Sequence, residues 1–142
     1  MPAATASRSN LVALSILVVA AIWFFSLAGG PAKPTVPVKS VSVEEAKALI
    51  DEGALVIDVR VLTASGPSHI PTAQLIPLEM LASYLDKLEA HKTKPIVVYC
   101  NEGNGRGPEA TSMLNKAGYT QAVNLKSGIE GWRAANLPTQ GS

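Results

Sequence analysis

Residues 95–110 read PIVVYCNEGNGRGPEA. The stretch opens with a proline and the apolar run Ile96–Tyr99, which is typical of a strand buried on both faces of a parallel sheet. A loop rich in glycine and asparagine follows, and Pro108 suits the first turn of a helix. A buried strand, a tight loop and a helix in this order predict one βα unit of an α/β domain.

Shorter patterns on either side continue the alternation of strands and helices. Ser42 and Glu45 fit a capping box that opens a helix, and Gly53 stands where helices commonly end. Apolar runs predict strands at 54–57, 73–76 and 122–125, and apolar residues at helical spacing predict helices at 78–90, 108–117 and 129–135. We therefore expect an α/β fold with a parallel sheet that is covered by helices on both faces.

The composition limits the classes of protein to which the chain can belong. It has 142 residues, about the length of one domain, and a formal net charge of +1. From residue 41 onward, nine Lys and Arg stand against eleven Asp and Glu, which argues against a nucleic-acid-binding surface. Cys100 is the only cysteine, so the chain can form neither an intramolecular disulfide nor a cysteine-cluster zinc site.

An apolar segment precedes the predicted domain. Residues 11–28 read LVALSILVVAAIWFFSLA, 18 residues with no charge and no proline. As one hydrophobic helix they would cover about 27 Å of a bilayer core about 30 Å thick. The segment is either a single-pass membrane anchor or a signal peptide cleaved after Ala28, which would export the domain to the periplasm or cell envelope. Its length favours the anchor, because the apolar part of a signal peptide is usually shorter.

The other boundaries follow from composition. Residues 1–10 form a short polar N-terminus, and residues 29–40 form a linker with three prolines and two glycines. The domain itself is expected over residues 41–138, with a tail at 139–142.

The residues around Cys100 combine a thiol with features that bind anions. Gly103 and Gly105 allow a tight loop to turn successive N–H groups inward, and Arg106 adds a cation. The helix that follows offers free N–H groups at its N-terminus. Positive charge and a helix N-terminus both favour the thiolate, which is the reactive form of cysteine. The pattern predicts an anion pocket with a nucleophile at its floor.

The domain resembles the rhodanese-like sulfurtransferases, the family of thiosulfate sulfurtransferases. The likeness covers nearly all of residues 41–138 and rests on VIDVR (56–60), SHIPTAQLIPL (68–78), IVVYCNEGNGR (96–106) and VNLKSGIEGW (123–132). The resemblance implies a central parallel sheet of five strands. It also implies that Cys100 takes a sulfane sulfur from a small anionic donor such as thiosulfate. The resulting persulfide would pass that sulfur to cyanide, a thiol or a protein acceptor.

The same resemblance assigns roles to individual residues. Cys100 and Arg106 would be catalytic, and the substrate would be bound by the active loop, Asn101, Glu102, Gly103, Asn104, Gly105 and Arg106. Asp58, Arg60 and His69 would support the site, the first two as an ion pair and the histidine as a hydrogen-bonded structural residue. No metal and no organic cofactor are implied.

One departure from the family pattern leaves alternatives open. Many members read C-x-x-G-x-R-S, whereas this chain has five residues between Cys100 and Arg106, one more than that pattern. C-x5-R is the spacing of thiol phosphatases, some built on the rhodanese fold, and of related arsenate reductases. A phosphatase needs a general acid, and Glu102 is the only acid in the loop. A third alternative is a membrane-tethered sulfur carrier or accessory subunit without turnover.

Overall fold

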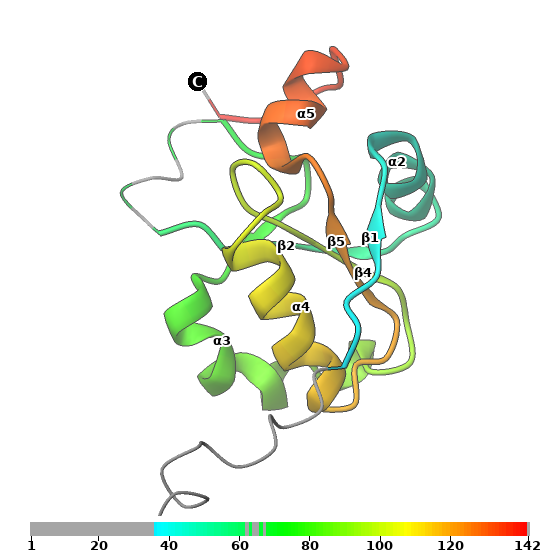
Figure 1. Cartoon of the computed structure of the whole chain (residues 1–142), viewed down its shortest axis with the longest axis vertical. Coiled ribbons are helices and arrows are strands. Elements are labelled where there is room, and N and C mark those ends of the chain that lie inside the picture. The colour runs from blue at the N-terminus through cyan, green and yellow to red at the C-terminus, as the bar shows by residue number, and fades with distance from the viewer. Residues whose placement is uncertain (1–35, 62, 64–65, 67, 142) are drawn as a thin grey trace, which may run out of the picture. The chain divides into compact units, whose positions relative to one another are not determined.

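The computed structural model describes residues 36–61, 63, 66 and 68–141. The elements are β1 (Ser40–Val41), α2 (Val43–Asp51), β2 (Leu55–Asp58), β3 (Gln74–Leu75), α3 (Leu78–Tyr84), the 3-10 helix η1 (Leu85–His91), β4 (Ile96–Tyr99), α4 (Arg106–Lys116), β5 (Ala122–Leu125) and α5 (Gly128–Ala134). Figure 1 shows how these elements are arranged.

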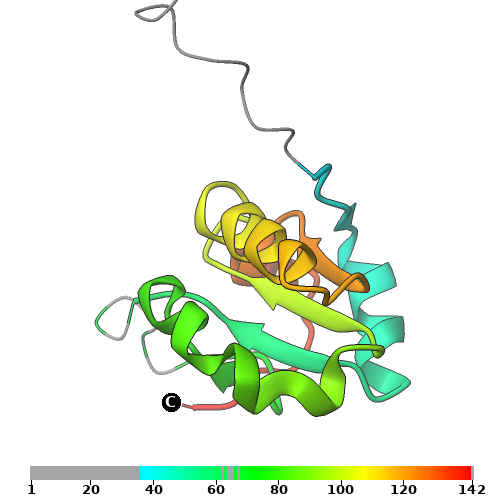
Figure 2. The same ribbon diagram turned by 90° about the horizontal axis from the view of Figure 1, so that it is seen from below.

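The five strands form one parallel sheet in the order β1-β5-β4-β2-β3. This confirms the expected α/β fold with a five-stranded parallel sheet. The connections through α3 and α4 cross the sheet in one direction, and the connection through α2 crosses it in the other. Because such crossovers are right-handed, α3 and α4 share one face and α2 lies on the opposite face. Figure 2 shows the strands between these helices.

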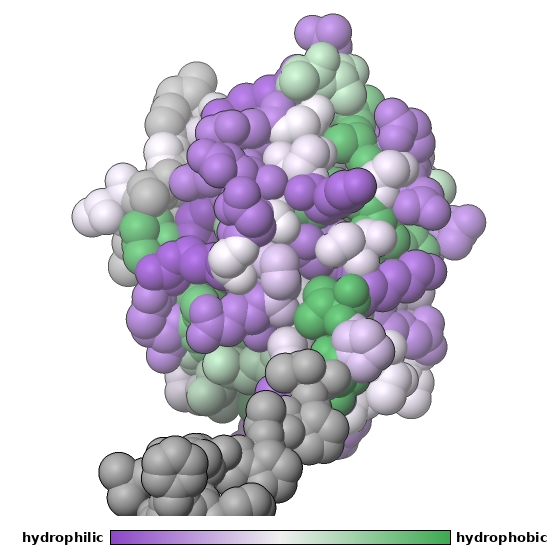
Figure 3. Space-filling model, viewed as in Figure 1, coloured by the Kyte–Doolittle hydropathy of each residue, from purple (hydrophilic) through white to green (hydrophobic). Residues whose placement is uncertain are grey.

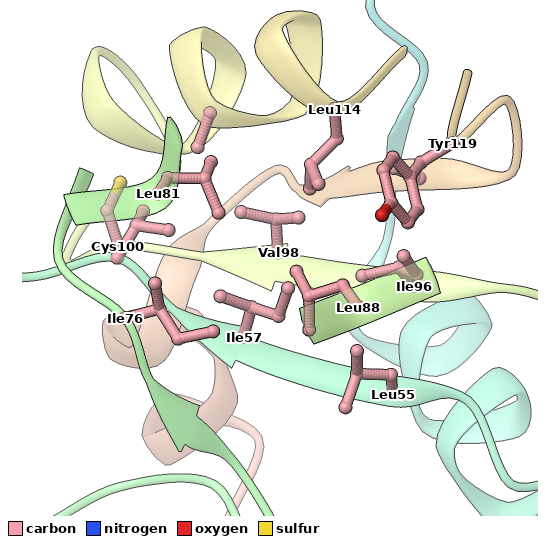
Figure 4. Packing of buried hydrophobic residues seen from close by; sticks show 13 residues of the cluster. Leu55, Ile57, Ile76, Leu81, Leu88, Ile96, Val98, Cys100, Leu114 and Tyr119 are labelled. Carbon is pink, nitrogen blue, oxygen red and sulfur yellow. The ribbon is translucent and has the colours of Figure 1, made fainter. Parts of the chain in front are cut away.

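The side chains of the sheet divide into two cores, because successive residues of a strand point to opposite faces. On β4, Ile96 and Val98 pack beneath α3, η1 and α4, whereas Val97 and Tyr99 pack on the side of α2 and α5. Figure 4 shows the first core, in which Leu114 of α4 lies above the strands. The predicted inward packing of Trp132 is confirmed, since it is buried in the second core.

Two local details differ from the sequence-based expectations. The predicted helix at 78–90 is α-helical only to Tyr84 and continues as η1. At that junction the carbonyl of Leu85 accepts a hydrogen bond from the hydroxyl of Tyr119, a partner from outside the helix. The second difference is the strand β1, which no apolar run in the sequence predicted.

The predicted capping box is confirmed. The Ser42 side chain accepts a hydrogen bond from the Glu45 N–H, and the Glu45 carboxylate accepts one from the Ser42 N–H.

The predicted apolar segment 11–28, and the linker up to residue 35, lie outside the described residues. Among the residues that the structure does describe, no helix combines the length and apolar character needed to cross a membrane. The anchor and the signal peptide therefore both stay predictions.

Candidate active site

Cys100 follows the last residue of the central strand β4, at the carboxyl end of the sheet. It continues the alternation of Ile96 and Val98, so its side chain enters the core beneath α4 (Figure 4). The residue is only 4% exposed. The nucleophile predicted from the sequence therefore lies at the base of the loop that joins β4 to α4.

The first two carbonyls of this loop point away from the thiol and are held by α5. The N–H of Ile129 donates to the carbonyl of Cys100 at 2.9 Å, and the N–H of Glu130 donates to the carbonyl of Asn101 at 3.1 Å. Both donors belong to the first turn of α5, whose N–H groups have no partner within their own helix. The helix thus fixes the start of the loop from behind.

Asn124 holds the next part of the loop. This β5 residue is 1% exposed, and its Nδ2 donates to the carbonyl of Gly103 at 2.9 Å and to the Ser40 hydroxyl at 3.1 Å. Its Oδ1 is buried and makes no hydrogen bond within the described part of the chain. A Cβ on Gly107 would lie 2.3 Å from that oxygen and 3.3 Å from the Cys100 sulfur, so the first turn of α4 needs a glycine here.

Two glycines let the loop and the turn before α5 approach each other backbone to backbone. A Cβ on Gly103 would lie 2.0 Å from the carbonyl oxygen of Lys126, and a Cβ on Gly128 would lie 2.2 Å from that of Asn101. Both glycines also have positive φ, +78° and +57°, where other residues are strained. The interlocked backbones leave no room for a side chain at either position.

Gly105 has a different role. It also has a positive φ, +77°, but a Cβ would meet nothing within 4 Å. It is therefore needed for its backbone conformation and not for space. The preceding carbonyl, that of Asn104, turns inward and accepts a hydrogen bond from the Cys100 thiol at an S···O distance of 3.5 Å. The loop thus places one carbonyl oxygen, and not only N–H groups, beside the sulfur.

Arg106 begins α4 and pairs with a carboxylate from another helix. Its Nη2 lies 2.5 Å from Oε1 of Glu79 in α3, and the two side chains are 36% and 58% exposed. The hydrogen bond from Arg106 lowers the pKa of Glu79, and the same bond raises the pKa of Arg106. The Nη1 of Arg106 is buried and makes no hydrogen bond to any described residue.

These residues surround an open cavity of about 240 Å³, hereafter the cup. It is lined by Cys100, Asn101, Glu102, Asn104 and Arg106. The cup brings together the predicted nucleophile, the predicted arginine and most of the predicted substrate-binding residues. The other two predicted substrate-binding residues do not line the cup: Gly103 is buried, and Gly105 is exposed.

The three predicted supporting residues lie at the end of the neighbouring strand β2 and in the segment that follows it. Asp58 and Arg60 form the expected ion pair, at 2.7 Å, and the side chains of both are 3% exposed. Tyr99 joins the pair: its hydroxyl donates to Asp58 Oδ2 at 3.0 Å and accepts from the Ile70 N–H at 3.2 Å. The Nη2 of Arg60 also donates to the carbonyl of Ser68, so the pair anchors the loop after β2.

His69 lies on the wall of a second cavity, of about 170 Å³, that Asp58 and Arg60 also line. Its N–H and carbonyl both pair with Gln140, each at 2.8 Å. The backbone of His69 is therefore tied to the C-terminal segment. The structure places this histidine beside the ion pair and not among the residues that line the cup.

Sequence reasoning missed two residues that shape the site. Asn124 is one of them, and its polar side chain in an apolar strand was the signal that could have revealed it. Glu79 is the other. It looks like an ordinary exposed acid at a helix start, and nothing in the sequence links it to Arg106, which lies 27 positions later.

Two bacterial proteins are similar in sequence to about two thirds or more of this chain. The protein YibN of Escherichia coli strain K12 is 38% identical over 107 residues, which cover 73% of each chain. The thiosulfate sulfurtransferase GlpE of Pseudomonas savastanoi pv. phaseolicola is 31% identical over 96 residues, which cover 68% of this chain and 88% of GlpE.

Solved structures and a family profile agree with these relatives. The rhodanese-like domain of the Anabaena Alr3790 protein superimposes with a TM-score of 0.62 at 25% identity, and covers 75% of this chain and 81% of that one. A rhodanese-like domain protein of Staphylococcus aureus gives 0.56 at 28% identity, covering 67% and 91%. The profile of the rhodanese-like domain matches residues 42–135. The chain therefore belongs to the rhodanese-like domain family.

Proposed function

We propose that the protein is a sulfurtransferase that carries sulfane sulfur on Cys100. The observation that carries the proposal is the position of this thiol at the base of a cup, with the carbonyls of residues 100, 101 and 103 bonded behind the loop. The 31% identity to a thiosulfate sulfurtransferase supports it. Arg106, which lines the same cup, would stabilise the anionic donor and the anionic leaving group.

The reaction has two half-reactions that need no other oxidant or reductant. In the first, the Cys100 thiolate attacks the outer sulfur of the donor, the S–S bond of the donor breaks, and sulfite leaves when the donor is thiosulfate. In the second, cyanide or a thiolate attacks the outer sulfur of the Cys100 persulfide. The persulfide bond breaks, thiocyanate or a new persulfide leaves, and the Cys100 thiolate is restored. One sulfur atom moves in each turnover.

The acid–base groups of the site favour sulfur transfer over phosphatase chemistry. A phosphatase must protonate its leaving group, whereas a persulfide exchange expels stable anions. Glu79 is near the cup, but the hydrogen bond from Arg106 lowers its pKa and keeps it ionised. Glu102 is exposed, and its Oε2 accepts from the Asn104 side chain at 3.4 Å. The ionised Glu79 has no proton to donate to a leaving group at neutral pH.

The mass of the intact full-length chain tests the proposal. After incubation with an excess of thiosulfate, we expect a gain of one sulfur, about 32 Da, that is lost on addition of cyanide and absent in Cys100→Ser. Hydrolysis of an aryl phosphate or reduction of arsenate, with no sulfur adduct, would overturn it. A stable adduct that neither cyanide nor small thiols remove would indicate a carrier that serves only a protein acceptor.

We propose further that residues 11–28 anchor this chemistry at a membrane. The length of the apolar segment supports an anchor over a cleaved signal. The N-terminal residue of the protein purified from its host decides between them. A start at or near Met1, with the protein in the membrane fraction, is expected, whereas a start at Gly29 would indicate export and release.

A further inference from the structure

We infer that Asn124 is a positioning residue for sulfur transfer: by holding the carbonyl of Gly103 behind the active loop, it turns the N–H of Asn104 toward the cup. This inference rests on the proposed function and deepens it. It follows from the way in which the carbonyls of the loop are held, because the C=O and the N–H of a trans peptide bond point in opposite directions.

Three peptide bonds of the loop have their carbonyl held from behind and their N–H left free. The carbonyls of Cys100 and Asn101 accept hydrogen bonds from backbone N–H groups of α5. The carbonyl of Gly103 accepts one from the side chain of Asn124. The N–H groups of the same three peptide bonds are those of Asn101, Glu102 and Asn104. None of them donates a hydrogen bond within the described part of the chain, so the loop offers all three to an anion in the cup that these residues line.

The third of these carbonyls is held in a different way from the first two. The first two are bound by the backbone of α5, so no substitution of a side chain removes those hydrogen bonds directly. Among the described residues, only the amide side chain of Asn124 donates to the carbonyl of Gly103, at 2.9 Å. The orientation of the Asn104 N–H therefore depends on a single side chain, which comes from the neighbouring strand β5.

The amide of Asn124 is itself held in one orientation. Hydrophilic residues gather on the surface of the domain, as Figure 3 shows for the face with α4, whereas Asn124 is only 1% exposed. Its Nδ2 also donates to the Ser40 hydroxyl at 3.1 Å. An exchange of Nδ2 and Oδ1 would place an oxygen against the carbonyl of Gly103. The amide keeps its orientation although Oδ1 is then buried with no hydrogen bond to a described residue, so the need of the loop for a donor determines how this side chain lies.

The Asn104 N–H can act where negative charge develops in the reaction. As the outer sulfur of thiosulfate bonds to Cys100, the S–S bond of the donor breaks and its electron pair leaves with sulfite. An N–H group that already points into the cup stabilises this growing charge more strongly than it stabilises the bound donor. We therefore expect that a loss of its orientation lowers the limiting rate of sulfur loading more than the affinity for thiosulfate.

Matched variants separate the two hydrogen bonds of the Asn124 amide. Asn124→Asp keeps the shape of the side chain and can still accept from the Ser40 hydroxyl, but it cannot donate to the carbonyl of Gly103. Ser40→Ala removes the other hydrogen bond and leaves the one to Gly103 in place. Asn124→Thr, whose hydroxyl lies one bond closer to the backbone than Nδ2, tests the same loss as Asn124→Asp without adding a charge.

The rate of sulfur loading is the first measurement. Loading of Cys100 is followed by intact mass on the full-length chain over a range of thiosulfate concentrations. In both Asn124 variants we expect the limiting rate to fall by about tenfold or more, and the half-saturating concentration to change by less than about threefold. Ser40→Ala should keep the limiting rate of the parent. An unchanged limiting rate in Asn124→Thr, or an equal loss in Ser40→Ala, would overturn the inference.

A second measurement distinguishes positioning from a general loss of structure or of charge balance. Sulfite, the leaving group of the first half-reaction, is added to the isotope-labelled full-length chain, and the backbone N–H signals are followed by NMR. In the parent, the signals of Asn101, Glu102 and Asn104 should all shift. In Asn124→Thr the shift at Asn104 should be lost and the other two kept, because α5 still holds the carbonyls of their peptide bonds.

The outcomes of the sulfite titration separate the inference from the proposed function. No shift at Asn104 in the parent, or a variant that loses all three shifts or none, would overturn the positioning role of Asn124. Failure of the parent to gain sulfur from thiosulfate would instead contradict the proposed sulfurtransferase, and the sulfite shifts would still decide whether Asn124 orients the loop.

Discussion

Two arginines follow neighbouring strands of the sheet, and each is paired with a carboxylate. Arg60 lies just after β2 and binds Asp58 through Nε and Nη2, with both side chains 3% exposed. Arg106 lies beyond β4 and binds Glu79 through Nη2, with side chains 36% and 58% exposed. The two pairs have the same chemistry, but only the second stands beside the reactive thiol.

The difference in burial gives the two pairs different roles. Burial alone would lower the pKa of Arg60, but the hydrogen bond and charge of Asp58 outweigh it and raise the pKa. The Arg60 guanidinium also lies 5.6 Å from the centroid of the Tyr99 ring, so the pair is held on several sides. The Arg106 pair is partly exposed to solvent, so it is less constrained when a charged ligand enters the cup. The first pair therefore stabilises the fold, and the second adjusts the charge of the cup.

The largest effect is expected at the buried pair. Asp58→Asn leaves the Arg60 charge without its counter-charge in the protein interior, so the free energy of unfolding should fall by about 3–5 kcal/mol. Urea unfolding followed by circular dichroism measures the loss. The double variant Asp58→Leu/Arg60→Met removes both charges and should lose less than the single variant. A loss below about 1 kcal/mol in Asp58→Asn would show that the two pairs are energetically alike.

The exposed pair should show the opposite response. Arg106→Met should leave the midpoint of urea unfolding unchanged and lower the rate of sulfur loading on Cys100 by about tenfold, because the guanidinium lines the cup. Arg106→Lys should recover part of the rate. Arg133→Met, which removes an exposed arginine on α5 that contacts Ser68, is the matched control and should keep the full rate. Equal losses in the two Met variants would assign the effect to general surface charge.

Tyr99 allows the buried pair to be probed with a smaller change. Tyr99→Phe removes the hydroxyl that donates to Asp58 and accepts from the Ile70 N–H, which should cost about 1–2 kcal/mol of stability at neutral pH. Urea unfolding of the variant and of the parent at the same pH measures the difference. No loss would mean that the Asp58–Arg60 pair needs no support from the strand that leads to Cys100.

The pH dependence of stability provides a further test of Tyr99. Burial, and then the negative charge of Asp58, raise the pKa of Tyr99 well above its usual value of about 10. Below that value both the folded and the unfolded chain keep the phenol proton. Above it the unfolded chain releases the proton first, so the free energy of unfolding should fall as pH rises. The fall should be shallower in Tyr99→Phe but not absent, because burial also raises the pKa of Tyr119.

The smallest effect on stability is expected for Glu79→Gln. Exposed ion pairs contribute little to stability, so the midpoint of urea unfolding should not change measurably. The rate of loading from thiosulfate should nevertheless increase, since Arg106 is no longer neutralised. A clear loss of stability would mean that this pair, too, holds the fold together.

Patterns that are local in the sequence predicted much of this structure. The run Ile96–Tyr99, the glycines after it and Pro108 each act within a few residues, and the structure places them as β4, a tight loop and the first turn of α4. The capping box of Ser42 and Glu45 is local in the same sense.

Features that depend on distant partners could not be predicted in this way. The strand β1 has two residues and exists through its pairing with β5, where Ser40 lies opposite Asn124. The anion pocket expected around Cys100 is altered by Glu79, which the fold brings to Arg106 from another helix. Sequence spacing indicated the cation but not the carboxylate that faces it.

The close contact between the active loop and the turn before α5 has a consequence for protein engineering. At Gly103 and Gly128 the backbone of the active loop is in contact with the backbone of the turn before α5. The conformation of each segment therefore depends on the other. Transplanting residues 100–106 into a related scaffold would carry only half of the unit. A functional graft would need residues 124–130 as well, so that the recipient acquires two matching surfaces and not a single loop.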